Sequence, residues 1–289
     1  MKYLVLGKSG QLASSFRDYF QNQDIDFISL GKEDLDLFSS DWQQKLKALE
    51  FDTIVNCMAF TAVDNAETNK ESADLLNAEF PLKLAMIAKE KNSTLVHYST
   101  DYVCDETDIN LRIKENHPCK PVNYYGKSKL EGELNIQKIL TKYFIFRTSW
   151  VFSQYGNNFV KTMLRLANEK DSLNVVKDQT GLPTFAGALA QYSFEIFSDN
   201  SSSYGTYNLS NNGPCNWAEF ARSIIGKGAN LGLCKNIPVH GIPSSEYPTP
   251  AKRPVANVFD LSKAESQIKK SLPHWQDSLD TVLNSLKNS

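Results

Sequence analysis

The residues best suited to chemistry lie in VNYYGKSKLEGE, residues 122–133, which has the composition of a helix. Tyr125 and Lys129 are four residues apart, so their side chains would project from the same helical face. Tyr124 has a serine at that offset and Lys127 points elsewhere, so only one tyrosine and one lysine converge. Because a neighbouring ammonium favours the phenolate, it brings a tyrosine into range as a general acid or base. The spacing predicts a proton-transferring pair, although an exposed helical pair has the same pattern.

Hydroxyl groups end the run TLVHYS, residues 94–99, which has the composition of a strand. Ser99 and Thr100 would lie at the carboxyl end of that strand, where parallel sheets bind their ligands. His97 lies inside the same run and is expected to be a hydrogen-bonded core histidine rather than a metal ligand.

A glycine turn, GKSGQLA at residues 7–13, follows the first apolar run and opens the first helix. Gly7 permits a tight turn, and Gly10 lets backbone amides approach a pyrophosphate at the helix N-terminus. Ala13 stands where helix and strand pack closely. The spacing departs from the strict dinucleotide fingerprint, and a glycine turn without a ligand is the alternative.

The second apolar run ends in SLGKED, where dinucleotide sites usually place an acid against the adenosine ribose. Here Lys32 precedes Glu33. Lys32 suits either a 2′-phosphate or a solvated surface position, so the choice between NADPH and NADH stays open.

Apolar runs alternate with helical patterns over the first 149 residues, which predicts βαβ units and a parallel sheet covered on both faces. Strands are expected at 3–7, 25–30, 52–57, 94–99 and 143–149, and helices at 10–22, 41–50, 69–91 and 123–141.

The pattern loosens after residue 150, with helices expected at 156–170, 185–199, 216–228 and 275–287 and strands near 173–176, 206–209 and 236–240. The predicted fold is a Rossmann-like doubly wound α/β sheet with a smaller C-terminal lobe. Residues 1–149 would form the dinucleotide-binding domain, with segments such as 171–210 returning to it. Residues 150–289 would form most of a discontinuous substrate-binding lobe.

The composition of this 289-residue chain limits the kinds of partner that it is expected to bind. A formal net charge of −2 and the absence of basic runs argue against nucleic acid as a partner. The apolar runs are too short for a membrane span or a secretion signal, so a cytoplasmic protein is expected. Five widely spaced cysteines without Cys-x-x-Cys argue for reduced thiols rather than a disulfide framework or a metal site.

Motifs along nearly the whole chain resemble the extended short-chain dehydrogenase/reductase family, and within it the dTDP-4-dehydrorhamnose reductases. The motifs are GKSGQLA (7–13), NCMAFTAVDNAE (56–67), STDYV (99–103), YGKSKLEGE (125–133), RTSWVF (147–152), GNNFVKTMLRLA (156–167), DQTGLPT (178–184) and KRPVANVFD (252–260).

The resemblance implies NADPH- or NADH-dependent reduction of the 4-keto group of a dTDP-4-dehydro-6-deoxy-L-mannose, giving dTDP-L-rhamnose for polysaccharide synthesis. It makes Thr100, Tyr125 and Lys129 the catalytic residues. With the glycine turn and Lys32, the implied cofactor-binding residues are Gly7, Ser9, Gly10, Gln11, Leu12, Lys32, Asp36, Leu37, Ala59, Thr61, Tyr125 and Lys129. The implied substrate-binding residues are Thr100, Asp101, Tyr102, Trp150, Asn158, Phe159 and Arg253.

Three positions depart from the family pattern. Cys104, Asp105 and Glu106 follow Val103, and the segment to residue 121 lacks the usual glycines. Ser15 stands where some relatives have a glutamate that helps bind magnesium at a dimer interface, so no metal is expected and the chain is taken as a monomer or homodimer. Ala13 replaces a glycine and still fits close packing.

Two other functions compete with this interpretation. Related dehydratases place an aspartate and a glutamate after the strand-four threonine, whereas this chain has Thr100-Asp101-Tyr102 and lacks the second acid. Another nucleotide-sugar 4-ketoreductase and a non-catalytic dinucleotide-binding regulatory subunit stay open, and the intact Thr100, Tyr125 and Lys129 favour an enzyme over the regulator.

Overall fold

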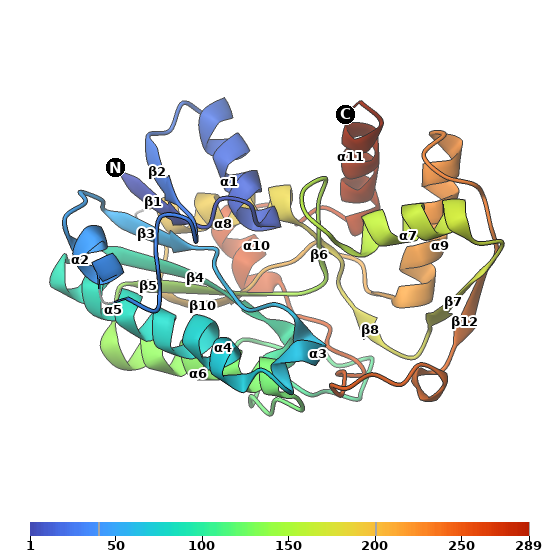
Figure 1. Cartoon of the computed structure of the whole chain (residues 1–289), viewed down its shortest axis with the longest axis horizontal. Helices are drawn as coiled ribbons and strands as arrows, with labels where there is room; N and C mark the ends of the chain where they lie inside the picture. Colours follow the sequence, from blue (N-terminus) through green and yellow to red (C-terminus); the bar gives the residue numbers. More distant parts are fainter. Residues whose placement is uncertain (40, 200, 289) are drawn as a thin grey trace.

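The protein contains a six-stranded parallel sheet with the strand order β10-β5-β4-β3-β1-β2 (Figure 1). Five of its strands come from the first 148 residues, and β10 comes from later in the chain. The computed structural model describes residues 1–39, 41–199 and 201–288. The strands are β1 (Tyr3–Leu6), β2 (Phe27–Leu30), β3 (Thr53–Asn56), β4 (Thr94–Thr100), β5 (Tyr143–Thr148) and β10 (Gly205–Asn208).

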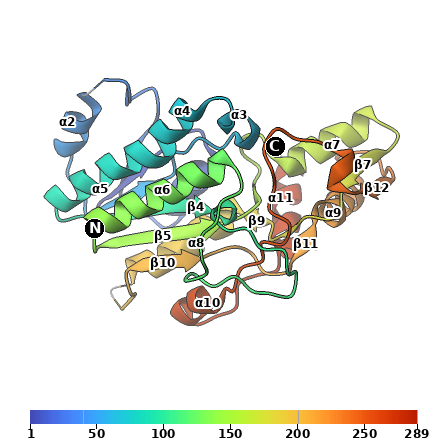
Figure 2. The same ribbon diagram turned by 90° about the horizontal axis from the view of Figure 1, so that it is seen from below.

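Helices cover both faces of this sheet (Figures 1 and 2). One face carries α2 (Asp41–Lys47), α4 (Lys70–Asp74), the π-helical turn η1 (Leu75–Glu79), α5 (Phe80–Glu90) and α6 (Tyr124–Ile139). The other face carries α1 (Gln11–Asn22), α8 (Ala186–Ser198) and α10 (Ser262–Ile268).

Two hydrophobic clusters fill the layers between sheet and helices, because successive strand residues point to opposite faces. In β1, Leu4 and Leu6 pack with α2, α5 and α6, while Tyr3 and Val5 pack with α1 and α8. Each strand is therefore apolar on both sides, which is the reason for the continuous apolar runs in the sequence.

The strand order reverses direction at β1. The chain moves from β1 to β2 on one side and then returns to place β3 on the other side. In an open α/β sheet, such a switch point leaves a crevice at the carboxyl ends of the two strands. The loops after β1 and β3 border this crevice.

A second lobe lies beside the sheet and encloses its own hydrophobic cluster (Figure 1). Its elements are α7 (Phe159–Glu169), α9 (Trp217–Asn230), α11 (Trp275–Lys287) and the parallel pair β7 (Leu173–Val176) and β12 (Val239–Ile242). The short elements are β6 (Val151–Phe152), β8 (Thr180–Gly181), β9 (Thr184–Phe185), β11 (Cys215–Asn216), α3 (Val63–Ala66), η2 (Asp101–Val103) and η3 (Ser244–Glu246).

The long elements expected from the sequence are confirmed, with ends that differ by a few residues. The helix expected at 69–91 is interrupted by the π-helical turn η1. Within 171–210, α8 packs on the six-stranded sheet and β10 joins it, whereas β7 pairs with β12 in the second lobe. The two-residue strands and α10 went unpredicted because such short segments carry no periodicity. No helix of the described residues has the length and apolarity to cross a membrane.

A close approach fixes α6 against η1. Gly132 of α6 lies so near the Asn77 backbone carbonyl that an added Cβ would overlap it. The Asn77 side chain accepts a hydrogen bond from the Phe60 amide at 2.9 Å and donates to Ser128 Oγ at 3.0 Å. This contact fixes how closely α6 and η1 pack side by side.

We expect Gly132→Ala to lower the free energy of unfolding by about 1–3 kcal/mol, because overpacking moves a helix against backbone. Gly226→Ala is the matched control, since a Cβ on that helical glycine of α9 meets nothing within 4 Å. The control should be neutral or more stable by up to about 1 kcal/mol. Denaturant unfolding of both variants measures this, and equal effects would contradict the close-packing argument.

Candidate active site

A cavity of about 510 Å³ opens at the switch point between β1 and β3. Its wall is built from the glycine turn, the segment after β2, the end of β3 and the α4–η1 region. The lining residues are Gly7, Lys8, Ser9, Gly10, Lys32, Glu33, Leu35, Asp36, Leu37, Phe38, Cys57, Met58, Ala59, Ser72, Leu75 and Leu76. Seven of the predicted cofactor-binding residues are in this set.

The glycine turn has the backbone geometry that a pyrophosphate requires. Gly7 has a φ of 115°, and a Cβ there would lie 3.3 Å from the Cβ of Ala13, so a small residue is needed at both positions. Gly10 precedes α1 without a side-chain cap, and a Cβ on it would meet nothing within 4 Å. First-turn amides and open space at a helix N-terminus fit a phosphate group.

Charged side chains gather at the cavity mouth after β2. Lys8 Nζ pairs with Asp34 at 2.6 Å and with Glu33 at 3.4 Å. Lys32 and Asp36 are exposed on the same rim. Lys32 and Glu33 are therefore neighbours in the cavity wall, and Glu33 is already paired with Lys8.

Five predicted cofactor-binding residues lie outside the cavity lining. Tyr125 and Lys129 belong to the centre on α6, and Thr61 is exposed in the segment after β3. Leu12 packs against the first hydrophobic cluster. Gln11 donates to the Val151 carbonyl at 3.4 Å and accepts from Ser153 and Asn158, so it links α1 to the second lobe.

Tyr125 and Thr100 meet at the carboxyl end of β4, next to β3, the strand that ends at the first cavity. Tyr125 is buried, with its ring edge-on to Tyr102 at 5.5 Å between centroids. Burial raises the pKa of Tyr125 to about 12, and its hydrogen bond with Thr100 acts in the opposite direction. The phenol is therefore protonated at neutral pH.

Lys129 lies one turn after Tyr125 and is only 1% exposed. Its Nζ donates to the Tyr98 carbonyl at 2.5 Å and lies 3.3 Å from Nε2 of His97. Burial lowers the pKa of Lys129 to about 8, while the charge of Glu133 acts in the opposite direction. The shared helical face is confirmed, but the expected lowering of the Tyr125 pKa is wrong, because burial of the phenol dominates.

His97 is a buried, hydrogen-bonded histidine, as expected. Asn56 Oδ1 accepts from the Met58 amide at 3.1 Å, so its Nδ2 faces His97 Nδ1 at 3.1 Å. Burial and the nearby Lys129 charge lower the pKa of His97 well below its usual value. A neutral ring that accepts at Nδ1 carries its proton on Nε2, which faces Lys129 and disfavours the ammonium.

Asp101 is a buried carboxyl group directly after Thr100. It accepts a hydrogen bond from the Thr100 hydroxyl at 3.0 Å. Burial raises the pKa of Asp101 to about 7, although hydrogen bonds from Thr100 and from backbone amides act in the opposite direction. The Asp101 side chain thereby orients the Thr100 hydroxyl.

A second cavity of about 510 Å³ lies between the lobes, and Tyr102, Phe159 and Arg253 of the predicted substrate-binding residues line it. The remaining lining residues are Asp64, Thr162, Met163, Leu166, Leu173, Asn174, Val175, Val176, Gln179, Trp217, Tyr247 and Thr249. The wall combines apolar and aromatic side chains with one arginine and one aspartate, which suits an amphipathic ligand.

An ion pair closes one side of this second cavity. Arg253 Nη2 donates to Asp64 Oδ2 at 2.8 Å, and Asp64 Oδ1 accepts from the Ala251 amide at 3.1 Å. Asp64 lies on α3 and Arg253 in the proline-rich segment near the C-terminus, so the pair joins the two lobes. The sequence motifs contained both residues, but only the fold shows their contact.

Trp150 and Asn158 are not among the residues that line this cavity, but each contacts a residue or helix that does. The Trp150 ring stacks on Trp217 with centroids 3.5 Å apart, and Trp217 lines the cavity. Trp150 has a φ of 45°, a strained value that its packing on Gly181 maintains. Asn158 caps α7 by accepting from the Lys161 amide at 3.2 Å. Trp217 was missed because nothing in its local sequence separates it from a core tryptophan.

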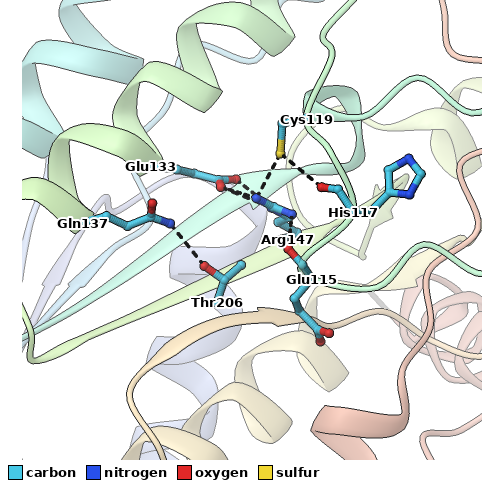
Figure 3. A network of polar contacts seen from close by, with 7 residues as sticks. All are labelled: Glu115, His117, Cys119, Glu133, Gln137, Arg147 and Thr206. Atoms are coloured by element: carbon cyan, nitrogen blue, oxygen red, sulfur yellow. Dashed lines mark hydrogen bonds and ion pairs between the residues drawn. The ribbon is translucent and has the colours of Figure 1, made fainter.

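A buried ion pair anchors α6 to the sheet. Arg147 of β5 donates through Nε and Nη2 to the Glu133 carboxylate, at 2.7 Å for the shortest contact (Figure 3). Its Nη1 donates to the Glu115 carbonyl at 3.1 Å, and its Nη2 to Cys119 Sγ at 3.2 Å. Burial lowers the pKa of Arg147, but the hydrogen bond and the charge of Glu133 raise it. The net effect is a raised pKa. The signal in the sequence was a single charge inside an apolar strand.

A Rossmann sheet with a cavity at its switch point and a neighbouring Thr–Tyr–Lys group is typical of an oxidoreductase of the short-chain dehydrogenase/reductase type. The model of the RmlD substrate binding domain family matches residues 1–288. The chain belongs to this family.

Relatives of the chain agree with this assignment. A dTDP-4-dehydrorhamnose reductase of Sinorhizobium fredii is 36% identical over 284 residues, which cover 96% of this chain and 95% of the relative. A crystal structure of a dTDP-4-dehydrorhamnose reductase from Clostridium acetobutylicum superposes with a TM-score of 0.92 at 33% identity, over 99% and 100% of the two chains. That of Bacillus anthracis, solved in complex with NADP, superposes with a TM-score of 0.91 at 33% identity, over 98% and 99%.

The raised pKa of Asp101 makes stability depend on pH. The pKa of Asp101 is about 7 in the folded chain, against an ordinary value of 3.8. The contribution of this carboxyl group to the free energy of unfolding is therefore full below pH 3.8 and is lost as the pH rises through 7. We expect wild type to lose about 2–3 kcal/mol relative to Asp101→Asn between pH 5 and 7. Denaturant unfolding of both proteins across this range measures the difference. Parallel pH curves would show that the carboxyl group is not buried in this way.

Proposed function

We propose that this protein reduces the 4-keto group of dTDP-4-dehydro-6-deoxy-L-mannose to dTDP-L-rhamnose with NADPH or NADH. The observation that carries the proposal is the buried Tyr125 phenol beside the Thr100 hydroxyl and edge-on to Tyr102, which lines the cavity between the lobes. The family and the relatives support the same reaction. Action in the cytoplasm as a monomer or homodimer belongs to the proposal.

The residues that would hold the dinucleotide are those of the first cavity. Gly7 and Gly10 leave room for the pyrophosphate, and the first-turn amides of α1 would donate to it. Lys32 and Asp36 would face the adenosine ribose, and Lys129 the nicotinamide ribose. When bound, the reduced nicotinamide supplies the hydride for the sugar carbonyl carbon.

Tyr125 would deliver the proton. Burial keeps its phenol protonated at neutral pH, which is the state that a proton donor to a developing alkoxide needs. Thr100 donates its hydroxyl proton to Asp101 in the absence of substrate and would turn it to the same sugar oxygen when the sugar is bound. Lys129, whose pKa of about 8 lies close to neutrality, is suited to return a proton to the phenolate after each turnover.

The second cavity would hold the sugar nucleotide. Arg253 carries a guanidinium fork that matches diphosphate oxygens, and Asp64 positions it. Trp217 and Phe159 offer aromatic surface, with rings 4.6 Å apart between centroids, and Trp150 stacks behind Trp217. Stacking on aromatic faces suits the flat thymine base.

Oxidation of NADPH and of NADH by the purified protein with dTDP-4-dehydro-6-deoxy-L-mannose tests the proposal directly. We expect Tyr125→Phe to lose about 10²–10⁴-fold in kcat, because the proton donor is removed. Tyr124→Phe is the matched control, since the neighbouring phenol donates instead to Asp74 at 2.6 Å. The control should keep near wild-type turnover.

Other outcomes would contradict the proposal in different ways. Dinucleotide binding without turnover would point to another sugar or to a regulatory subunit. Equal losses in the two tyrosine variants would remove Tyr125 from its role as proton donor.

We expect Arg253→Ala to raise KM for the nucleotide sugar by about 10–100-fold with a smaller change in kcat, as for the loss of a charged hydrogen bond. The KM of Arg253→Lys should lie between those of wild type and Arg253→Ala, because lysine keeps the charge but lacks the guanidinium fork. Lys252→Ala is the control, since that side chain is exposed and Asn123 contacts only its carbonyl. Steady-state kinetics measure all three, and an unchanged KM in Arg253→Ala would exclude the contact with the diphosphate.

A further inference from the structure

The segment between η2 and α6 carries two of the five cysteines of the chain, Cys104 and Cys119. Cys104 is fully buried directly after η2, the turn that contains Asp101 and Tyr102. Cys119 is partly exposed and lies four residues before Asn123, the cap of α6. Fourteen residues lie between the two cysteines in the chain, but the two ends of this segment return to one place, so the sulfurs lie close together in space.

The two thiols are in contact. Cys104 lies in the first hydrophobic cluster and Cys119 packs against it, and the two thiols lie close enough for each to shift the pKa of the other through a hydrogen bond. Arg147 Nη2 also donates to Cys119 Sγ, at 3.2 Å (Figure 3). Cys119 thus accepts hydrogen bonds from a thiol and from a guanidinium.

This environment makes Cys119 the more reactive sulfur. The hydrogen bond from Cys104 and the charge of Arg147 lower the pKa of Cys119 to about 7, against the effect of burial. The pKa of Cys104 is raised, first by its hydrogen bond with Cys119 and then by burial. Burial raises the pKa of Cys57, Cys215 and Cys234. A thiolate beside a cation and a second thiol is the arrangement of a redox-reactive pair.

We propose that Cys104 and Cys119 are a modification site, at which hydroperoxides drive formation of a reversible disulfide. The Cys119 thiolate attacks the peroxide oxygen and forms a sulfenic acid, with release of hydroxide or alkoxide. The Cys104 sulfur then attacks the sulfenic sulfur, and its proton leaves with the hydroxyl group as water. The two thiols lose two electrons and the peroxide gains them; a dithiol reductant reverses the step.

The disulfide would act on the site described above, and this part of the inference rests on the proposed function. An S–S bond of about 2.05 Å is much shorter than a contact between two thiols, so the end of η2 and the approach to α6 must move together. Little slack is available, because the Tyr102 carbonyl already lies where a Cβ on Gly126 would be. Tyr102 and Tyr125 would shift relative to each other, and turnover would fall.

Peroxide treatment of the reduced, full-length protein tests the modification without any substrate. We expect the loss of two thiols to a thiol reagent, the loss of two hydrogen atoms in intact mass, and a peptide linked between Cys104 and Cys119 without reduction. Cys234→Ala, the control, should behave as wild type. In Cys104→Ala the sulfenic acid on Cys119 should persist and react with a 1,3-dione probe, whereas Cys119→Ala should not label.

The result that overturns the site is a protein whose oxidation links other cysteines, or whose probe labelling is the same with and without Cys119. A well-folded Cys104→Ala variant keeps this test valid even if Cys119→Ala is unstable.

A second experiment measures NADPH oxidation with dTDP-4-dehydro-6-deoxy-L-mannose before and after formation of the Cys104–Cys119 disulfide. We expect at least about a tenfold loss of kcat that a dithiol restores, since small displacements of catalytic groups cost up to about 100-fold. Unchanged turnover in fully crosslinked protein would overturn the link to the active site. If the reduced protein itself shows no turnover, the proposed reaction fails while the mass and labelling results still decide the disulfide.

Discussion

The buried contact between Arg147 and Glu133 is the interaction on which the position of α6 depends. It holds the middle of α6 against β5, while Gly132 lets the same helix approach η1. Tyr125 and Lys129 lie on the first turns of this helix, so their placement over β4 follows from both contacts. An arginine fork suits this function because it also reaches the Glu115 carbonyl and Cys119, and so orders the segment that leads into α6.

Burial, more than pairing with opposite charges, sets the pKa values of the groups around Tyr125. Desolvation moves the pKa of Tyr125 and of Asp101 upward and that of Lys129 downward, so each group is biased toward its neutral form. At pH 7 the Tyr125 phenol is protonated, and Lys129, with a pKa of about 8, still carries the proton that it could pass on. The neutral His97 ring, oriented by Asn56, connects this group toward Met58, which lines the first cavity.

The parallel sheet, its long helices and the Tyr125–Lys129 face were predictable from the sequence, because each depends on short-range periodicity. The partners of Arg147 and Arg253 were not predictable in this way. Glu133 and Asp64 lie 14 and 189 residues from them, and nothing local relates the members of each pair. The same limit applies to Trp217, whose role follows only from its stack with Trp150. The resemblance predicts Arg253 as a substrate-binding residue, but its contact with Asp64 could be seen only in the fold.

The place of β10 in the sheet has a consequence for how the chain folds during synthesis. β10 begins at residue 205 and pairs with β5, which ends at residue 148. Until those later residues leave the ribosome, β5 is an edge strand with unpaired amides and carbonyls, next to the aromatic surface of Phe144 and Phe146. The nascent sheet is thus most prone to aggregation in this interval, and its completion waits for a segment made after the start of the second lobe.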